Sequence, residues 1–236
     1  MSRRLPALLA AILAPAAQAQ TQGWGGSVGA TSDYAYRGVT QSNNLPAAQA
    51  DLHYYGASGW FAGLWASTVK RFPGAPVAAE FDTYLGYGWP LTSDWTTRVF
   101  GVHHEYPWNN PHGNYNYDEL SGTVAYADRA ALTVAVSPDF SVQGPYENAS
   151  GRVVLSYDLA LHQPLYRALS ANAGLGYYDL RWAVGSGYVY WNAGLGYDFG
   201  RVQLDLSYIG TNGYARSLYY PGETVNRLVA SVLWHF

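Results

Sequence analysis

The sequence contains no cysteine, which excludes disulfide bonds and thiolate metal ligands. Charged residues make up only 12% of its 236 residues, whereas about 25% is usual for soluble domains. No uninterrupted apolar run approaches the roughly 18 residues that a membrane-spanning helix needs, although 49% of the chain is hydrophobic. The formal net charge of −3 argues against a nucleic-acid partner, because phosphates select basic surfaces. This combination is unusual for a soluble enzyme.

Glycine and aromatic residues are abundant instead. The chain has 26 glycines, 22 tyrosines and 9 tryptophans. A chain that is polar, aromatic and poor in charge is typical of a transmembrane β-barrel, which presents one face to lipid and the other to water. The length is sufficient for one such domain and short for two.

The N-terminus carries the features of an export signal. Arg3 and Arg4 form a positive region, residues 5–14 supply a short apolar core, and residues 17–19 match the small-x-small cleavage pattern. We therefore expect residues 1–19 to be a signal peptide and residues 20–236 to be the mature barrel. The expected location is the outer membrane of a Gram-negative bacterium.

Alternation of apolar and polar residues predicts the strands. Within residues 79–89, Phe81 and Leu85 fall on one face, whereas Glu80 and Asp82 fall on the other. The same pattern recurs along the chain and predicts an all-β, closed antiparallel transmembrane barrel of about twelve strands. The expected strands lie near residues 25–37, 46–55, 59–69, 79–89, 95–106, 116–126, 130–138, 150–162, 167–179, 188–199, 201–210 and 225–236.

The expected connections are sorted by length. Those that follow even-numbered strands are tight, as at residues 56–58, 127–129 and 163–166. Those that follow odd-numbered strands are mostly long and rich in glycine, proline and asparagine, as at residues 107–115 and 211–224. Short periplasmic turns and longer extracellular loops are typical of outer-membrane barrels.

Aromatic residues lie at the ends of the expected strands, where girdles contact the membrane interface. The final strand ends with Trp234 and Phe236, and a C-terminal Phe on such a strand resembles the assembly signal of outer-membrane barrels. We therefore expect two partners, the membrane lipids and, during biogenesis, the barrel-assembly machinery. Other expected girdle residues are Trp89, Trp95 and Phe199 on the periplasmic side and Tyr34, Tyr36, Tyr106, Tyr177 and Tyr190 on the opposite side.

The inward face of the expected strands carries charges of both signs with a modest acidic excess. For any one of these charges, an ion pair that braces the wall is at least as good an explanation as solute selection. Twelve strands lie between filled barrels of about eight strands and open porins of about sixteen to eighteen, so we expect a narrow or partly occluded lumen. The expected lumen residues are Asp33, Arg37, Asp51, His53, Glu80, Asp82, Arg98, Glu119, Arg152, Asp158, Arg201, Asp205 and Arg227.

Signals for catalysis or metal binding are weak. The best catalytic candidate is the run His103-His104-Glu105 near His112, but adjacent strand residues face opposite ways. These histidines also lack a recognised zinc spacing. Asp139 and Glu147 could hold calcium, and are more simply solvated loop charges. We expect no catalytic residue, no cofactor and no metal.

Residues 27–42, which read SVGATSDYAYRGVTQS, closely resemble the opening of the TorF family of porins, earlier catalogued as the Gcw_chp family. Further matches follow in order at residues 59–67, 82–87, 117–120 and 137–139. The resemblance covers nearly the whole mature chain and is most specific at its beginning.

This resemblance implies an outer-membrane barrel that passes small solutes. We expect Asp33 and Arg37 to form a lumen pair near the extracellular mouth, followed by a loop that turns inward. The alternative is that Gly38 and its neighbours form only a stereotyped turn. The residues that match the most distinctive family motif are Asp33, Tyr34, Arg37, Gly38, Gln41 and Ser42.

Three functions stay open from the sequence. The preferred one is a porin-like channel for passive diffusion of small hydrophilic solutes, which an open, charge-lined lumen favours. A structural or binding barrel with a closed lumen is favoured by Arg–carboxylate pairs that seal it. A membrane-embedded lipid hydrolase needs a Ser or Asp beside His103 or His104 at the lipid boundary. No interface signature sets the oligomeric state.

Overall fold

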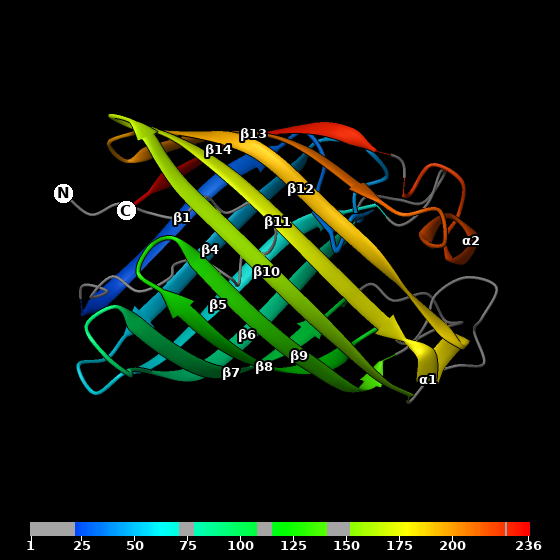
Figure 1. The fold of residues 1–236 in the computed structure, drawn as a ribbon, viewed down its shortest axis with the longest axis horizontal. Helices are drawn as coiled ribbons and strands as arrows, with labels where there is room; N and C mark the ends of the chain where they lie inside the picture. Colours follow the sequence, from blue (N-terminus) through cyan, green and yellow to red (C-terminus); the bar gives the residue numbers. More distant parts are fainter. Residues whose placement is uncertain (1–21, 71–77, 108–114, 141–151, 225) are drawn as a thin grey trace.

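The computed structural model describes residues 22–70, 78–107, 115–140, 152–224 and 226–236. Within these ranges, twelve antiparallel strands close into one barrel, which confirms the expected fold class (Figure 1). The barrel strands are β1 (Gly23–Thr31), β4 (Ala47–Tyr55), β5 (Trp60–Val69), β6 (Ala78–Pro90), β7 (Trp95–Glu105), β8 (Tyr117–Tyr126), β9 (Ala130–Phe140), β10 (Arg152–Tyr166), β11 (Leu169–Leu180), β12 (Ser186–Phe199), β13 (Val202–Thr211) and β14 (Arg227–His235).

The barrel closes where the first strand meets the last. β1 pairs with β4 on one side and with β14 on the other, with Val28 opposite Trp234. Two further backbone hydrogen bonds join Gly26 and Phe236, with N···O distances of 3.2 and 3.1 Å. Closure leaves no strand edge unpaired, which is the condition for a sheet to exist in hydrocarbon.

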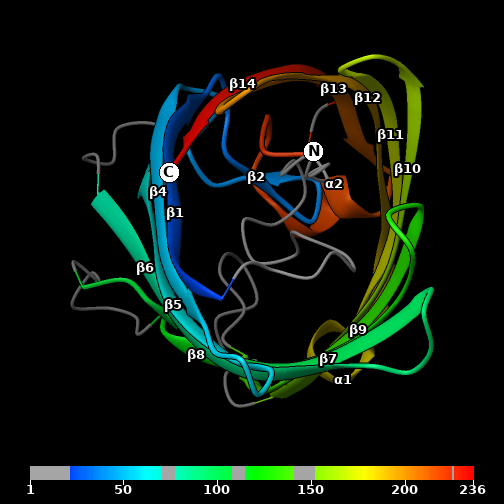
Figure 2. The same cartoon turned by 90° about the vertical axis from the view of Figure 1, so that its left-hand side faces the viewer.

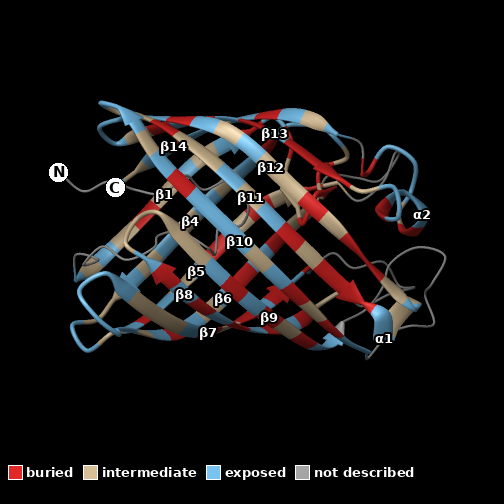
Figure 3. Ribbon diagram, in the orientation of Figure 1, coloured by how far each residue is buried: buried red, intermediate tan, exposed pale blue. Residues whose placement is uncertain are grey.

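The two faces of the wall are inverted relative to a soluble protein. In β8, buried and exposed residues alternate without a break. The buried positions hold polar side chains such as Glu119, Ser121 and Thr123, whereas Leu120 and Val124 are exposed. The same alternation is visible along the other strands (Figure 3). A polar interior beneath an apolar exterior suits a barrel that is surrounded by lipid.

The connections differ at the two ends of the barrel (Figure 1). At the end where β1 begins and β14 ends, two-residue turns such as Arg167–Ala168 and Gly200–Arg201 join the strands. The opposite end carries the longer connections, including the short helices α1 (Arg181–Val184) and α2 (Ala215–Leu218). None of the helices within the described ranges has the length and apolar character to cross a membrane.

Two strand boundaries differ from expectation by four residues or more. The first strand was expected to run over residues 25–37 but ends at Thr31, because the chain leaves the wall there. The turn expected at residues 163–166 is part of β10, where Pro164 lies beside a register shift that removes the need for its missing N–H.

Aromatic side chains surround the turn end of the barrel. Trp89, Trp95 and Phe199 are exposed there, as are Trp234 and Phe236, whose ring centroids lie 5.3 Å apart. Their role as an assembly signal stays a prediction, and the expected signal peptide lies outside the described residues.

The expected girdle at the loop end is wrong for four of its five tyrosines. Tyr106 and Tyr190 are buried inside the barrel, while Tyr34 and Tyr36 lie on a loop that leaves the wall. Of the five, Tyr177 alone lies on a barrel strand without being buried. The tyrosine hydroxyls have polar partners in the lumen, which explains why these rings turn inward.

Glycines on the inner face leave space for aromatic rings. A Cβ atom on Gly86 would lie 2.4 Å from Cζ of Phe61, 2.5 Å from Cβ of Phe100 and 2.7 Å from a backbone oxygen. By contrast, a Cβ atom on Gly122, on the outer face of β8, would meet nothing within 4 Å.

We expect Gly86→Ala to lower the free energy of unfolding by about 1–3 kcal/mol, because the new methyl group overpacks a space already filled by two rings. Gly122→Ala is the matched control and should change the free energy of unfolding by less than about 1 kcal/mol. Urea unfolding of the barrel in lipid vesicles measures both. Equal effects of the two substitutions would contradict the proposed packing role of Gly86.

Candidate functional site: the lumen and its inward loop

The connection between β1 and β4 folds into the barrel (Figure 2). We call residues 32–46 the inward loop. It contains a hairpin of β2 (Ala35–Tyr36) and β3 (Val39–Thr40), whose turn places Arg37 at φ 50° and Gly38 at φ 79°. Two successive positive φ angles define a type I′ turn, which costs little at glycine and more at arginine. The loop therefore turns inward as expected, and its motif also forms a stereotyped turn.

Gly38 is required by its surroundings as well as by its backbone angle. A Cβ atom there would lie 2.4 Å from Cγ2 of Thr211 and 3.0 Å from Cβ of Tyr190. The tip of the hairpin thus packs against the wall at β12 and β13 with no room for a side chain.

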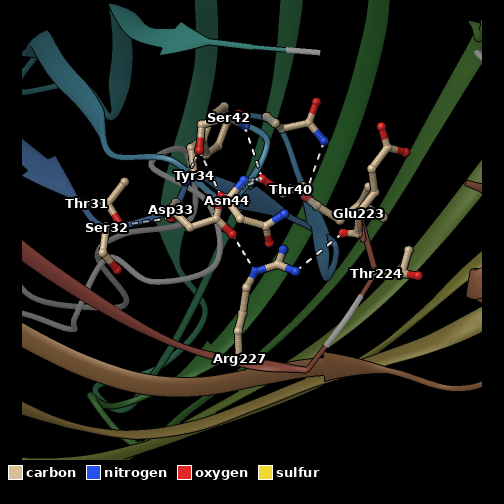
Figure 4. Close-up of polar contacts among 12 residues, drawn as sticks. Thr31, Ser32, Asp33, Tyr34, Thr40, Ser42, Asn44, Glu223, Thr224 and Arg227 are labelled. Carbon is tan, nitrogen blue, oxygen red and sulfur yellow. Dashed lines mark hydrogen bonds and ion pairs between the residues drawn. The ribbon is translucent and has the colours of Figure 1, made fainter. Parts of the chain in front are cut away.

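Asp33 anchors the base of the inward loop (Figure 4). Its buried carboxylate accepts hydrogen bonds from the hydroxyls of Thr40 and Ser42, the latter at 2.8 Å. It also forms an ion pair with Arg227 at the start of β14. The backbone N–H of Thr40 donates to the carbonyl of Glu223 at 3.0 Å. These contacts hold one side of the loop to the segment that leads into the last strand.

Arg37 anchors the tip. Its Nη2 atom lies 2.7 Å from Oε2 of Glu119 on β8 and donates to Oγ of Ser156 on β10 at 2.8 Å. The guanidinium carbon lies 4.6 Å from the ring centroids of both Tyr36 and Tyr178. A charge enclosed by a carboxylate and two aromatic faces is among the stronger arrangements for a buried arginine.

Arg37 and the two tyrosines of the inward loop keep fixed protonation states. Burial lowers the pKa of Arg37, but Glu119 and the nearby tyrosines outweigh this effect and hold the pKa well above its usual value. Burial is the largest cause that raises the pKa of Tyr34 and of Tyr36. The loop therefore presents a permanent cation and neutral phenols to the lumen.

The expected pair of Asp33 with Arg37 is wrong. Each residue instead pairs with the wall, Asp33 with Arg227 and Arg37 with Glu119. The reason is geometric, because Asp33 lies at the base of the hairpin and Arg37 at its tip. As β14 and β8 lie on different sides of the barrel, the loop crosses the lumen between its anchors (Figure 2).

The remaining motif residues organise the loop backbone. The hydroxyl oxygen of Ser42 accepts from the N–H of Tyr34 at 2.9 Å and lies 2.6 Å from the carbonyl oxygen of Leu45, so Asp33 and Leu45 share its single proton. The N–H of Gln41 donates to the carbonyl of Tyr34 at 2.6 Å. The family motif is thus a set of residues that close one loop on itself.

Other charges line the wall on either side of the loop. Asp51 accepts from the hydroxyl of Tyr84 at 2.8 Å and pairs with His53. Asp205 accepts from Nε2 of Gln203 at 2.8 Å. The remaining wall charges are Asp158, which accepts from Tyr190, and Arg98, whose guanidinium carbon lies 5.5 Å from the ring centroid of Phe100.

Two expected lumen residues lie elsewhere. Arg152 is exposed at the loop end, where a register shift between Arg152 and Val154 breaks the alternation. Arg201 is exposed in the turn before β13. Both arginines were expected to face the lumen because an unbroken alternation was assumed. Alternation fails at Arg152 because of the bulge and at Arg201 because the strand has not yet begun.

A cluster of Glu80, Asp82 and His104 is the feature that sequence reasoning missed. His104 Nδ1 lies 2.9 Å from Oδ1 of Asp82 and 3.6 Å from Oε1 of Glu80. The ring of Tyr117 stacks on His104 with centroids 4.3 Å apart. Alternation along each strand could have shown that His104 faces inward. Only the register between β6 and β7, however, places His104 opposite Asp82.

His103 faces the other way, as its position beside His104 requires. On the outer surface its Nδ1 lies 2.8 Å from Oδ1 of Asp118. The pair lines a hollow of about 460 Å³ together with Thr83. Residues 25–29 spell Gly-x-Ser-x-Gly, but they lie within β1 and so form no strand-to-helix nucleophile turn.

The other catalytic and metal candidates add little to the site. His112 and Glu147 lie outside the described residues. Glu105 ends β7 on its exposed face, and Asp139 is exposed near the end of β9.

Comparison with known proteins identifies a family and a fold. The model of a bacterial protein family of unknown function, Gcw_chp, matches residues 16–236. Comparison with curated proteins gives no significant match.

Solved structures that resemble the chain are outer-membrane barrels. The KdgM porin is 11% identical with a TM-score of 0.53, and the match covers 90% of this chain and 99% of the porin. The outer membrane phospholipase (OMPLA) dimer of Salmonella typhi is 13% identical with a TM-score of 0.50, covering 92% and 94%. At these identities the likeness shows the fold alone.

We expect Arg37→Gln to lower the free energy of opening of the inward loop by about 3–5 kcal/mol, because it leaves Glu119 buried without its cation. Adding Glu119→Gln should recover part of this loss, since no unpaired charge then remains. Amide hydrogen exchange of residues 32–46, followed by mass spectrometry, measures the opening. Arg201→Gln, which changes an exposed arginine, is the control. Unchanged protection in Arg37→Gln would contradict the anchoring role.

Proposed function

The chain belongs to the Gcw_chp family of bacterial proteins, and from its barrel architecture we propose that it is a narrow outer-membrane channel for passive diffusion of small hydrophilic solutes. In this proposal the signal peptide directs it to the outer membrane of a Gram-negative bacterium. Membrane lipids contact its outer face, small solutes enter its lumen, and the barrel-assembly machinery inserts it.

The observation that carries the proposal is the polar lumen of a closed barrel. Apolar side chains such as Leu64, Leu132 and Leu175 are more than half exposed on the outside, where lipid would cover them. Inside, carboxylates and hydroxyls line the wall from Asp51 to Asp205. A purely structural barrel has no need of such a polar lumen surface, whereas this surface suits the passage of hydrated solutes.

The charges of the lumen favour cations. Carboxylates outnumber guanidinium groups along the wall, and two of the arginines, Arg37 and Arg227, are already paired with carboxylates. Asp51, Asp158 and Asp205 have no arginine or lysine within ion-pair distance among the described residues. A low-dielectric wall concentrates the field of such groups, so a positively charged or neutral solute is favoured over an anion.

The inward loop makes the channel narrow. It crosses the lumen and is held at both ends by buried ion pairs, so a solute has to pass beside it. The same pairs favour the second candidate function, a binding or structural barrel with a closed lumen. Conduction separates the two candidates.

Single-channel recording of the refolded mature chain in a planar bilayer tests the proposal. We expect discrete conductance steps and a reversal potential in a salt gradient that indicates cation preference. Asp51→Asn and Asp205→Asn should each weaken that preference, because each removes a lumen charge. Asp94→Asn, which removes an exposed carboxylate in a turn, is the matched control. A folded barrel that shows no steps would refute the channel and favour the closed lumen.

The lipid hydrolase has one observation in its favour, the pair of His103 and Asp118 on the outer face. No hydroxyl group among the described residues hydrogen-bonds to His103, so the pair lacks a nucleophile in place. We therefore propose that the protein is not an enzyme.

For phospholipid hydrolysis in mixed micelles, we expect equal background rates from the folded wild-type barrel and from His103→Ala. The reason is that the imidazole has no nucleophile to deprotonate. A wild-type rate that falls in His103→Ala would overturn this expectation.

A further inference from the structure

Three ionisable side chains converge on the inner wall of the barrel from two adjacent strands. Glu80 and Asp82 are two residues apart on β6 and therefore share a face. His104 on β7 is the register partner of Asp82. All three are buried, with side-chain exposures of 2–3%.

The donor atoms of the three side chains have the spacing of metal ligands. One atom from each lies within 4.8 Å of the others, and Nδ1 of His104 is 2.9 Å from Asp82 and 3.6 Å from Glu80. Ligands of a tetrahedral zinc ion at about 2.0–2.2 Å lie roughly 3.3–3.6 Å from one another. The two distances from Nδ1 of His104 therefore lie within a few tenths of an ångström of those in a shared zinc site.

One oxygen in the cluster has no partner. Oε1 of Glu80 accepts a hydrogen bond from the hydroxyl of Tyr106 at 2.7 Å, but Oε2 of the same buried carboxylate has no hydrogen-bond partner among the described residues. An unpaired carboxylate oxygen in such an enclosed place is costly. Arg37, the nearby arginine of the inward loop, is already engaged by Glu119. The cluster therefore combines two carboxylates with one imidazole and leaves a lone pair free.

We propose that Glu80, Asp82 and His104 form a binding site for a divalent transition-metal cation. Imidazole together with carboxylates suits zinc and its neighbours, whereas calcium and magnesium prefer sets of oxygen ligands alone. The cation would occupy the free lone pair of Glu80 and neutralise the excess negative charge. The site differs from the sequence-based expectation of no metal, and it stands whether or not the lumen conducts.

The position of this site links it to the inward loop. The ring of Tyr36 lies with its centroid 6.2 Å from that of His104. A bound cation would therefore lie beside the segment that crosses the lumen, and it would change the charge that a solute meets there.

Calorimetric titration of Zn²⁺ into the refolded, untagged mature barrel tests the proposal. We expect one Zn²⁺ per chain and at least about tenfold weaker binding in each of Glu80→Gln, Asp82→Asn and His104→Gln, because each removes a ligand. His103→Gln is the matched control, since it changes the adjacent histidine that faces outward. His53→Gln is the second control, because His53 pairs with a single lumen carboxylate.

Two further measurements keep the test independent of whether the variants fold. Heat-dependent mobility in gel electrophoresis reports folding of each variant, and Co²⁺ bound to the wild-type barrel should give visible d–d absorption that Zn²⁺ displaces. Absence of Zn²⁺ uptake by the folded wild type would overturn the site, as would equal losses in the controls. Tighter binding of Ca²⁺ or Mg²⁺ than of Zn²⁺ would overturn the assignment to a transition metal.

Discussion

Hydrogen bonding between β1 and β14 is the constraint on which the rest of the structure depends. Closure satisfies every strand edge, and it divides the side chains into those that face the lumen and those that face outward. The outer set must be apolar, so polar and charged groups accumulate inside. Because a ring of twelve strands has a lumen wider than its wall side chains can fill, the interior holds a segment of its own chain as well.

The wall was predictable because its signals are local. Alternation in residues 79–89 identified β6 to within one residue at each end, and strict alternation identified β8 equally well. The first strand was overextended because Asp33, Tyr34 and Arg37 continue an alternating pattern after the chain has left the wall. What turns the chain inward is a set of contacts with Glu119, Ser156 and Arg227, which no local pattern can reveal.

For the candidate site, the sequence could predict which side chains face the lumen, but it could not predict which of them pair with one another. Asp51, Glu80, Asp82, Glu119 and Asp205 were all expected on the inner face, and the structure places them there. Their partners depend on strand register and on the path of the inward loop, which alternation leaves open. The cluster with His104 illustrates this limit, since a shift of one residue between β6 and β7 would turn the imidazole to the outside.

The contact between the inward loop and β14 also has a consequence for the order of folding. The backbone N–H of Ser32 donates to the carbonyl of Ala230 at 2.8 Å, 198 residues further along the chain, and Asp33 pairs with Arg227 at the start of the same strand. These partners belong to the last strand, so the loop cannot reach its final position until the C-terminal segment has joined the barrel. Contacts of such long range form late. The inward loop thus reaches its final position only when the barrel has closed. A barrel that has not yet closed would therefore have a wider lumen than the finished one.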